Sequence, residues 1–466
     1  MTRMRLGMRM LFALWLASLA PGSLAASADP YAGSSGSWGQ AYADQWGLTA
    51  IGWQAQVVAE PLAEVLVAII DTGLDYYHPD LAGVRLYSNP DDVLNGRDDD
   101  GNGYVDDVIG WNFVDGNGNP WDQAGHGTHV TGVIAATTGN GRGVAGIAPN
   151  VRIMPLKVLN FIGRGTTTRV AEAIYYAVSK GARVINLSLG GEAPSMALQR
   201  AVDHAARHQV LVVLAAGNAG KEMAQPRFVD QPNLITVGAI DPARVRAGFS
   251  NYGPGVDLVA PGTDILSLRA RRTDVSLVAG LADYAAGQNF VGRGAHYYRA
   301  NGTSFAAPFV TAAAALLIGR DPKLDATSVK RMLLQSAKDL DIPGVDNQTG
   351  YGLLDLPGSL KQAPERFIDA RVTGLGVVQR ADGLFIQVSG IARADRFGEA
   401  WVETGKGDDP TNWRKAEARL TSPVSQGLLA ELPAGVFDAP GRWTVRLTVT
   451  HADGTRREAR SVLDIE

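Results

Sequence analysis

The chain contains no cysteine among its 466 residues. This absence excludes a disulfide scaffold and any mechanism that uses a catalytic thiolate. Basic runs are also absent, since 43 Lys and Arg stand against 47 Asp and Glu and give a formal net charge of −4. Because phosphate recognition needs clustered Lys and Arg, we expect no nucleic-acid partner. We also expect no organic cofactor, and the composition is that of a globular protein.

The apolar run near the N-terminus is short. It covers only the 11 residues 10–20, whereas a membrane-spanning helix needs roughly 20. Basic residues precede the run and small residues follow it, namely Arg3, Arg5, Arg9, Ala26, Ser27 and Ala28. This order predicts a signal peptide over residues 1–28, with cleavage after Ala25 as an alternative. We therefore expect a secreted or periplasmic protein without a membrane span.

Strand and helix patterns alternate along residues 29–364. Five nearly continuous apolar runs predict strands that are buried on both faces: residues 65–70, 153–159, 184–189, 210–215 and 234–239. A helical stripe that starts at Val170 ends near Gly181, and residues 195–207 and 325–336 have similar patterns. The alternation predicts an α/β domain with a mostly parallel sheet and a ligand site at the carboxyl ends of its strands.

The pattern changes near Pro364. Short alternating runs follow, at residues 384–388, 400–403 and 443–449, and Gly, Asp and Pro separate them. About 100 residues of this kind predict a small β-sandwich as a second domain over residues 365–466.

Three separated segments place an acid, an imidazole and a hydroxyl at the ends of predicted elements. Asp71 ends the first strand, His126 opens a helical segment, and Ser304 lies where an alanine-rich helix begins. A serine hydroxyl is a poor nucleophile unless a neutral imidazole takes its proton and a carboxylate orients that imidazole. These residue types therefore suit nucleophilic catalysis. Asn218, after another strand, offers a side-chain donor for an oxyanion beside the Ser304 N–H.

Each candidate also has a simpler interpretation when taken alone. A serine before a helix is usually an N-cap, and an aspartate after a strand is usually a turn residue. His126 and His129 have the i, i+3 spacing of a possible zinc pair, but neither a Glu between them nor a nearby third histidine supports it. We therefore expect His129 to be a packed helix residue.

Four motifs follow one another along the chain: DTG at Asp71, HGTHV at His126, AAGN at Asn218 and GTSFAAP at Ser304. In this order they resemble the subtilisin-like serine proteases, and the likeness extends over about residues 44–359. The resemblance implies a subtilisin-like three-layer α/β fold. It also implies hydrolysis of peptide bonds through an acyl-enzyme, with an Asp/His/Ser triad and an asparagine oxyanion donor.

The same resemblance implies a cleft for an extended peptide. Its backbone edges and walls would be Ser188, Leu189, Gly190, Ala215, Ala216 and Gly217. Strand addition holds a substrate with little sequence preference. Ordinary packing at strand ends remains the alternative for these segments.

An acidic loop gives a candidate metal site. Oxygen-bearing side chains alternate from residue 98 to residue 102 before Gly103, as in the first half of a calcium loop, but Ile109 stands where the closing Glu would be. The predicted ligands are Asp98, Asp100, Asn102 and Asp107. Similar loops occur in many secreted subtilisin-like enzymes. We predict a structural calcium ion here, with a solvated acidic turn as the alternative.

The chain departs from the family pattern in two places. Only the 42 residues 29–70 lie between the predicted signal peptide and Asp71, so we expect no long inhibitory propeptide. An insertion at residues 269–299 precedes the serine motif and would form a loop near the cleft or a processing site. The C-terminal region weakly resembles immunoglobulin-like or fibronectin-like modules, at residues 408–413 and 441–448.

The sequence thus predicts a secreted serine endopeptidase whose partner is a protein or peptide substrate. Two alternatives remain: a maturation protease dedicated to one partner protein, and a secreted peptide-binding protein whose protease domain is unproductive. The sequence indicates neither the cleavage-site preference nor the oligomeric state.

Overall fold

The computed structural model describes residues 28–55, 61–189, 195–223, 231–273, 288–292 and 294–465. Three sequence predictions fall wholly or partly outside the described residues: most of the signal peptide, Gly190 of the predicted cleft, and the middle of the 269–299 insertion.

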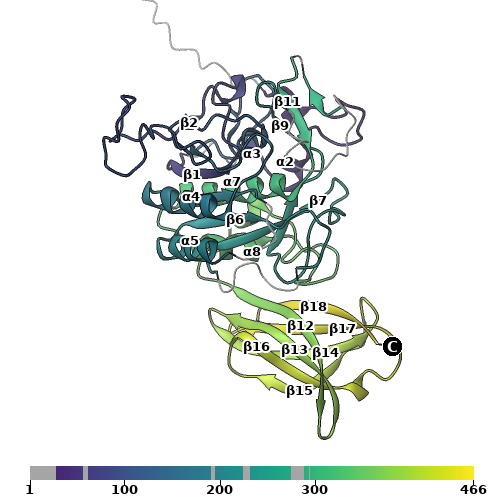
Figure 1. Ribbon diagram of the computed structural model, residues 1–466. Helices are drawn as coiled ribbons and strands as arrows, with labels where there is room; N and C mark the ends of the chain where they lie inside the picture. Colours follow the sequence, from purple (N-terminus) through teal and green to yellow (C-terminus); the bar gives the residue numbers. More distant parts are fainter. Residues whose placement is uncertain are drawn as a thin grey trace, which may run out of the picture.

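A parallel sheet forms the centre of the larger part of the chain (Figure 1). Its strands are β1 (Val65–Asp71), β2 (Arg85–Leu86), β3 (Trp111–Asn112), β4 (Val151–Lys157), β5 (Val184–Leu187), β6 (Leu211–Ala215), β7 (Leu234–Ile240) and β8 (Leu258–Pro261). They follow the order β2-β4-β1-β5-β6-β7-β8, with β3 also paired to β4, and each of these pairs is parallel. The five predicted strands are confirmed as β1, β4, β5, β6 and β7.

Helices cover both faces of this sheet. The helices of this part are α1 (Pro30–Gly33), α2 (Trp46–Ala50), α3 (His126–Ala135), α4 (Thr167–Ser179), α5 (Met196–Arg207), α7 (Thr303–Arg320), α8 (Ala326–Ser336) and α9 (Leu356–Ser359), with a 3₁₀ turn η2 (Pro79–Leu81). Along β1, Val67 and Ile69 join the apolar core of α3 and α7, whereas Ala68 and Ile70 join that of α4 and α5. Because side chains alternate along a strand, both faces of β1 are buried. The predicted three-layer α/β fold is confirmed.

Helix α7 is the central helix of the core. It is long and apolar enough to cross a membrane by length and composition, but 94% of its apolar window is buried inside the protein. A helix that is apolar on all sides is typical of a protein core as well as of a membrane. In this chain α7 packs against α3 and the sheet, so it is a core helix.

A small antiparallel sheet lies beside α3. It consists of β9 (Ile265–Leu268), β10 (Phe290–Val291) and β11 (Tyr297–Ala300) in the order β10-β11-β9. The second described end of the 269–299 insertion contributes β10 and most of β11 to this sheet.

Antiparallel strands form the C-terminal part, drawn in yellow-green at the bottom of Figure 1. They are β12 (Ile368–Arg380), β13 (Gly383–Ala394), β14 (Phe397–Lys406), β15 (Arg414–Leu420), β16 (Val424–Pro433), β17 (Gly441–His451) and β18 (Arg456–Ile465), with a 3₁₀ turn η3 (Ala434–Val436). One sheet has the order β12-β13-β16 and the other β15-β14-β17-β18. Inward residues such as Val388 and Leu447 are fully buried between them. This is the predicted small β-sandwich.

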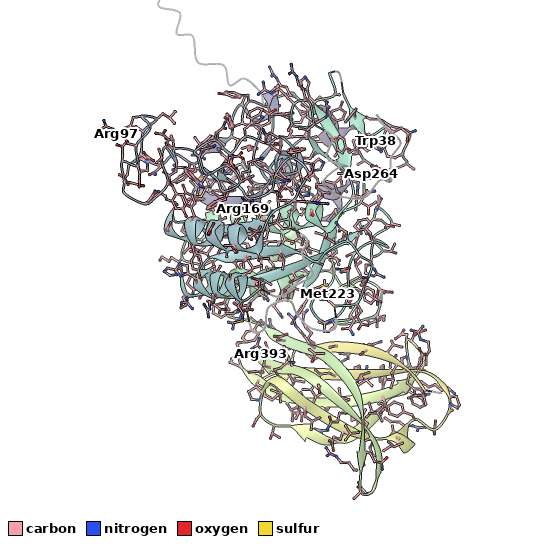
Figure 2. The ribbon with its side chains drawn as sticks, viewed as in Figure 1. Trp38, Arg97, Arg169, Met223, Asp264 and Arg393 are labelled. Carbon is pink, nitrogen blue, oxygen red and sulfur yellow. The ribbon has the colours of Figure 1, made fainter. Side chains whose placement is uncertain are left out.

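A network of charges joins the two parts. Asp257, just before β8, accepts a hydrogen bond from Arg371 at 2.8 Å and lies 3.4 Å from Lys330. Asp369 pairs with Arg371 at 3.1 Å and with Arg393 at 3.0 Å. Figure 2 shows Arg393 at this junction. Burial opposes ionisation of Asp257, but Lys330 and Arg371 hold its pKa below the usual value.

Backbone contacts strengthen the same junction. Val345 forms a parallel bridge with Ala459 of β18, and the Gln335 side chain exchanges hydrogen bonds with the backbone of Ile368. The junction lies at the amino end of β8. The two parts therefore meet at the edge of the sheet opposite to the carboxyl ends of its strands.

Candidate active site

Asp71 and His126 form a direct pair at the carboxyl end of β1. The Nδ1 atom of His126 lies 2.8 Å from Oδ1 and 3.0 Å from Oδ2 of Asp71. Asp71 is fully buried and His126 is 3% exposed. The carboxylate therefore holds the ring with Nδ1 protonated, which leaves Nε2 as the basic nitrogen.

Glycines allow the two segments to approach each other closely. Gly73 has φ of +110°, and a Cβ there would lie 2.3 Å from the carbonyl oxygen of Pro120. A Cβ on Gly127 would lie 2.3 Å from the carbonyl oxygen of Gly73. Without side chains at these two positions the segments lie close enough for the Gly127 N–H to donate to Thr72 Oγ1 at 2.9 Å. This is the local reason for the glycines in the DTG and HGTHV motifs.

Asp122 caps the helix that carries His126. Its Oδ1 accepts the N–H groups of Ala124 at 3.0 Å and Gly125 at 2.7 Å, and its Oδ2 accepts the N–H and hydroxyl of Thr128. The sequence analysis missed this residue. An aspartate a few residues before a helix start is the signal that could have identified it.

The two histidines of α3 have opposite electrostatics. Burial disfavours the imidazolium of His126, but the charge and hydrogen bond of Asp71, together with the charge of Asp122, raise its pKa above the usual value. Burial lowers the pKa of His129 to about 3. The Nε2 atom of His129 lies 3.0 Å from the Tyr298 carbonyl oxygen and contacts that of Ile265. His129 is therefore a neutral packed residue, as predicted.

Ser304 is the second residue of α7 and is 8% exposed. Its carbonyl oxygen accepts a hydrogen bond from Ser188 Oγ at 2.7 Å, and Asn186 Nδ2 donates to that same Oγ at 2.8 Å. The ring of the next residue, Phe305, lies 5.1 Å from the ring of His126. Among the described residues, the Ser304 hydroxyl forms no hydrogen bond, so its proton is uncommitted.

Asn218 is oriented from one side only. Its Oδ1 accepts both the N–H and the hydroxyl of Thr303, at 2.8 and 2.9 Å. Within the described part of the chain, its Nδ2 donates to no group. This nitrogen lies 3.4 Å from the position that a Cβ on Gly302 would occupy. Thr303 thus directs the amide N–H groups toward the backbone just before Ser304. The sequence analysis missed this role of Thr303.

The predicted cleft segments follow β5 and β6. Ser188 and Leu189 come directly after β5, and Ser188 contacts the Ser304 backbone as described. Ala216 follows β6, and its carbonyl oxygen accepts a hydrogen bond from Asn251 at 3.0 Å. The Gly217 N–H donates to Thr303. These segments lie at the same sheet edge as Asp71, since all these strands are parallel.

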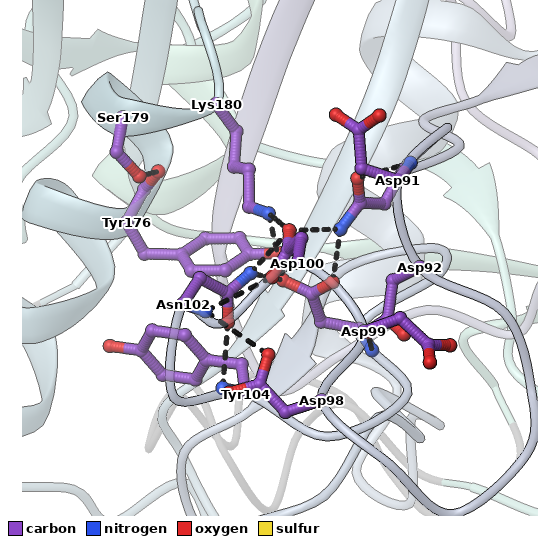
Figure 3. Close-up of polar contacts among 12 residues, drawn as sticks. Asp91, Asp92, Asp98, Asp99, Asp100, Asn102, Tyr104, Tyr176, Ser179 and Lys180 are labelled. Atoms are coloured by element: carbon purple, nitrogen blue, oxygen red, sulfur yellow. Dashed lines mark hydrogen bonds and ion pairs between the residues drawn. The ribbon is translucent and has the colours of Figure 1, made fainter.

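The acidic loop brings together some of the predicted calcium ligands (Figure 3). Lys180 Nζ lies 2.8 Å from Asp100 Oδ2 and 3.1 Å from Asp107 Oδ2. Asn102 Nδ2 donates to the same two oxygens. Asp98 instead accepts backbone N–H groups within the loop turn, at 3.0 and 2.8 Å.

The cation among these carboxylates is an ammonium group. Burial opposes ionisation of Asp100, but hydrogen bonds from Asn89 and Lys180 hold its pKa well below the usual range. In the described ranges, no group of three or more His, Asp or Glu side chains is arranged to hold a metal ion. Asp100 and Asp107 therefore have suitable chemistry for a hard cation, but the set as arranged does not fit calcium while Lys180 stays in place.

Comparison with known proteins gives a consistent result. The profile of the subtilase family, peptidase S8, matches residues 63–352. The thermophilic serine proteinase of Bacillus sp. (strain AK1) is 39% identical over 252 residues, which are 54% of this chain and 51% of that protein. This chain thus spans about half the length of that relative.

Two further proteins match over most of their own length. Subtilisin DY of Bacillus licheniformis is 35% identical over 297 residues, which are 63% of this chain and 90% of subtilisin DY. A crystal structure of a lanthipeptide protease matches with a TM-score of 0.53 and 28% identity, over 68% of this chain and 94% of that one. With the profile, these matches show that the chain belongs to the subtilase family, the predicted class of subtilisin-like serine endopeptidases.

Proposed function

We propose that this protein is a secreted serine endopeptidase that hydrolyses peptide bonds through an acyl-enzyme. The buried pair of Asp71 and His126 carries the proposal, because the His126 ring is fixed with Nε2 free to act as a base. Ser304, at the amino end of α7, is the proposed nucleophile.

In the proposed first step, Ser304 Oγ attacks the scissile carbonyl carbon while His126 Nε2 takes the hydroxyl proton. Asp71 stabilises the resulting imidazolium through the Nδ1–H contact. The peptide C–N bond then breaks as His126 returns the proton to the leaving amine. In the second half of the reaction a water molecule attacks the ester carbonyl while His126 takes its proton; the C–Oγ bond then breaks, the carboxylic acid product leaves and His126 returns the proton to Ser304 Oγ.

Two N–H donors stabilise the tetrahedral oxyanion in this proposal. They are Asn218 Nδ2, which Thr303 orients, and the Ser304 N–H at the positive end of the α7 dipole. Fixed donors cost no reorganisation when charge develops, which is why an amide held by its own oxygen suits this role.

The substrate is proposed to be an extended protein or peptide chain. It would lie against the segments after β5 and β6, namely Ser188, Leu189, Gly190, Ala215, Ala216 and Gly217. The Ser188 hydroxyl supports this placement, because it ties one segment directly to the backbone of the nucleophile.

We propose that residues 29–364 are the catalytic domain and that residues 365–466 are an accessory domain that packs on it. The charge network of Asp257, Arg371 and Asp369 supports the packing of the second domain on the first. The order of basic, apolar and small residues at the N-terminus supports export by a signal peptide. N-terminal sequencing of the exported product tests the cleavage site.

Calcium is proposed as a structural ion of the acidic loop that competes with Lys180 for Asp100 and Asp107. Asp98 and Asn102 would complete its ligands. Residues 91–107 carry seven aspartates and one arginine, and this excess of negative charge supports divalent-cation binding. A bound ion would stabilise the loop and take no part in peptide hydrolysis.

Labelling with a fluorophosphonate tests the proposed activity. We expect the purified wild-type protein to be labelled and Ser304→Ala to remain unlabelled with an unchanged circular dichroism spectrum. Ser250→Ala is a matched control, since Ser250 is fully buried but its hydroxyl bonds to Ala239 and Asn251. Full labelling of Ser304→Ala would refute the assignment, and hydrolysis of casein by the wild type would support a general protease.

A further inference from the structure

Lys157 is a buried lysine at the end of β4. It pairs in parallel register with Asp71 of β1, and only 1% of it is exposed. Taking an ammonium group out of water is costly unless other groups compensate for its charge. A lysine buried at the end of this strand therefore needs a compensating role, which neither the fold nor the Asp71–His126 pair by itself explains.

One residue, Thr72, connects Lys157 to both segments of the Asp71–His126 pair. Lys157 Nζ donates to the Thr72 carbonyl oxygen at 2.8 Å. The Thr72 N–H donates to Asp71 Oδ1 at 2.7 Å, and Thr72 Oγ1 accepts the Gly127 N–H beside His126. A change in the backbone conformation of Thr72 would therefore move the Asp71 carboxylate and the start of α3 together.

The charges around Lys157 are those that act on the histidine. Burial lowers the pKa of Lys157, while Asp122, Asp115 and Asp71 oppose that effect. Asp71 and Asp122 also raise the pKa of His126. Within the described residues, the ammonium makes no ion pair with any of these carboxylates, so it faces all three without being committed to one.

Lys157 does not reach the reacting atoms. It is almost completely inaccessible, and among the described residues its ammonium donates only to the backbone carbonyl of Thr72, the residue after Asp71. Its effect on the reaction must therefore pass through Thr72, Asp71 and the local electrostatic potential.

We propose that Lys157 is a positioning residue of the triad, whose ammonium holds the Thr72 backbone between Asp71 and the start of α3 and places a positive charge near the buried carboxylates there. This inference rests on the proposed protease function. Removing the positive charge leaves the negative charges of Asp71 and Asp122 unopposed by the ammonium, so the imidazolium of His126 becomes more stable. The neutral, basic form of His126 then appears only at higher pH.

Two variants separate the charge from the hydrogen bond. Lys157→Met removes both, whereas Lys157→Gln removes the charge and keeps an N–H donor. In both we expect the acidic limb of kcat/KM on a chromogenic peptide to move up by about one pH unit. We expect kcat above the limb to fall about tenfold in Lys157→Met with KM unchanged, and to recover in part in Lys157→Gln.

A second lysine provides the matched control. Lys330 is also largely buried, with 17% of its side chain exposed, and it donates to the Leu234 carbonyl oxygen at the domain junction. Lys330→Met should lower the melting temperature and leave the limb in place. If the Met variant of Lys157 does not fold, the Gln variant carries the same limb test.

The outcome that overturns the proposal is an unmoved limb with wild-type kcat per folded molecule in the Lys157 variants, whatever their melting temperatures. Such a result would make Lys157 a purely structural residue. Wild-type hydrolysis and its loss in Ser304→Ala test the protease function separately, so failure of one proposal is distinguishable from failure of the other.

Discussion

The two ends of the central sheet treat buried charge in different ways. At the amino end of β8, Asp257 contacts two cations, and Asp369 is paired with two arginines. At the carboxyl ends of the strands, His126 Nε2 and the Ser304 hydroxyl have no hydrogen-bond partner among the described residues. At the junction, each carboxylate has its charge balanced by two cations, and these ion pairs hold the two domains together. At the other end, polar groups without a full set of hydrogen bonds remain available to a substrate.

The largest effect on stability is expected from breaking the saturated network. Arg371→Met leaves Asp257 and Asp369 without their shared partner, and we expect a loss of about 3–5 kcal/mol in the free energy of unfolding. Urea unfolding measures it. Arg380→Met is the matched control on the same strand, because the Arg380–Glu431 pair is exposed and should contribute little to stability.

Activity per folded molecule should stay unchanged in Arg371→Met, because the network lies at the opposite edge from Asp71. A fall in kcat measured on titrated active sites would show that the two ends of the sheet are coupled, and would break the comparison.

Removing the uncommitted donor at the other end should affect activity instead. Asn218→Ala removes the amide that Thr303 orients, and we expect kcat to fall by roughly 10²–10³-fold with little change in KM or melting temperature. Steady-state kinetics on a peptide substrate measure it. A negligible change in kcat would assign the oxyanion to another donor.

The acidic loop is intermediate between the two ends, since its paired carboxylates are the fully buried Asp107 and the partly exposed Asp100. Lys180→Met should lower the free energy of unfolding by about 1–2 kcal/mol, because Asp100 and Asp107 lose their ammonium partner. Calcium should raise the melting temperature of the wild type and raise that of Lys180→Met further. Unchanged melting temperatures in calcium and in excess chelator would refute a calcium site here.

The smallest expected effect is a shift of one titration. Because the pKa of His126 is raised, the acidic limb of kcat/KM should have its midpoint above pH 6.5, the usual histidine value. The corresponding stabilisation is fully present below the unfolded-state pKa and is lost as the pH rises through the folded-state pKa. NMR titration of the His126 ring in Ser304→Ala measures this pKa, and a value below 6.5 would contradict the electrostatic argument.

Local motifs predicted the fold well, and the Asp71–His126 contact is consistent with the proposed triad. The apolar run before Asp71 became β1, and the HGTHV segment became the start of α3, because each pattern depends on neighbours in sequence. Lys157 lies within the run predicted as a buried strand, but nothing in that run indicates the contact that its ammonium makes. Its partner Thr72 is 85 residues away, so only the parallel pairing of β4 with β1 reveals the contact.

The charge network between the domains was equally hidden. Asp257 and Arg371 are separated by 114 residues, and neither belongs to a motif. Lys180 follows a helix that the sequence did predict, yet nothing in the helix pattern indicates that its ammonium reaches the acidic loop. Contacts of this kind depend on how elements pack, which the period of the apolar residues does not specify.

The position of the β-sandwich has a practical consequence for immobilising the protein. A resin, tag or particle attached to the solvent-facing strands β15 and β16 would lie beyond the amino ends of the parallel strands, away from Asp71 and His126 (Figure 1). The proposed substrate cleft of an anchored molecule would then face the bulk solution, so large protein substrates should approach it as freely as they approach the dissolved protein.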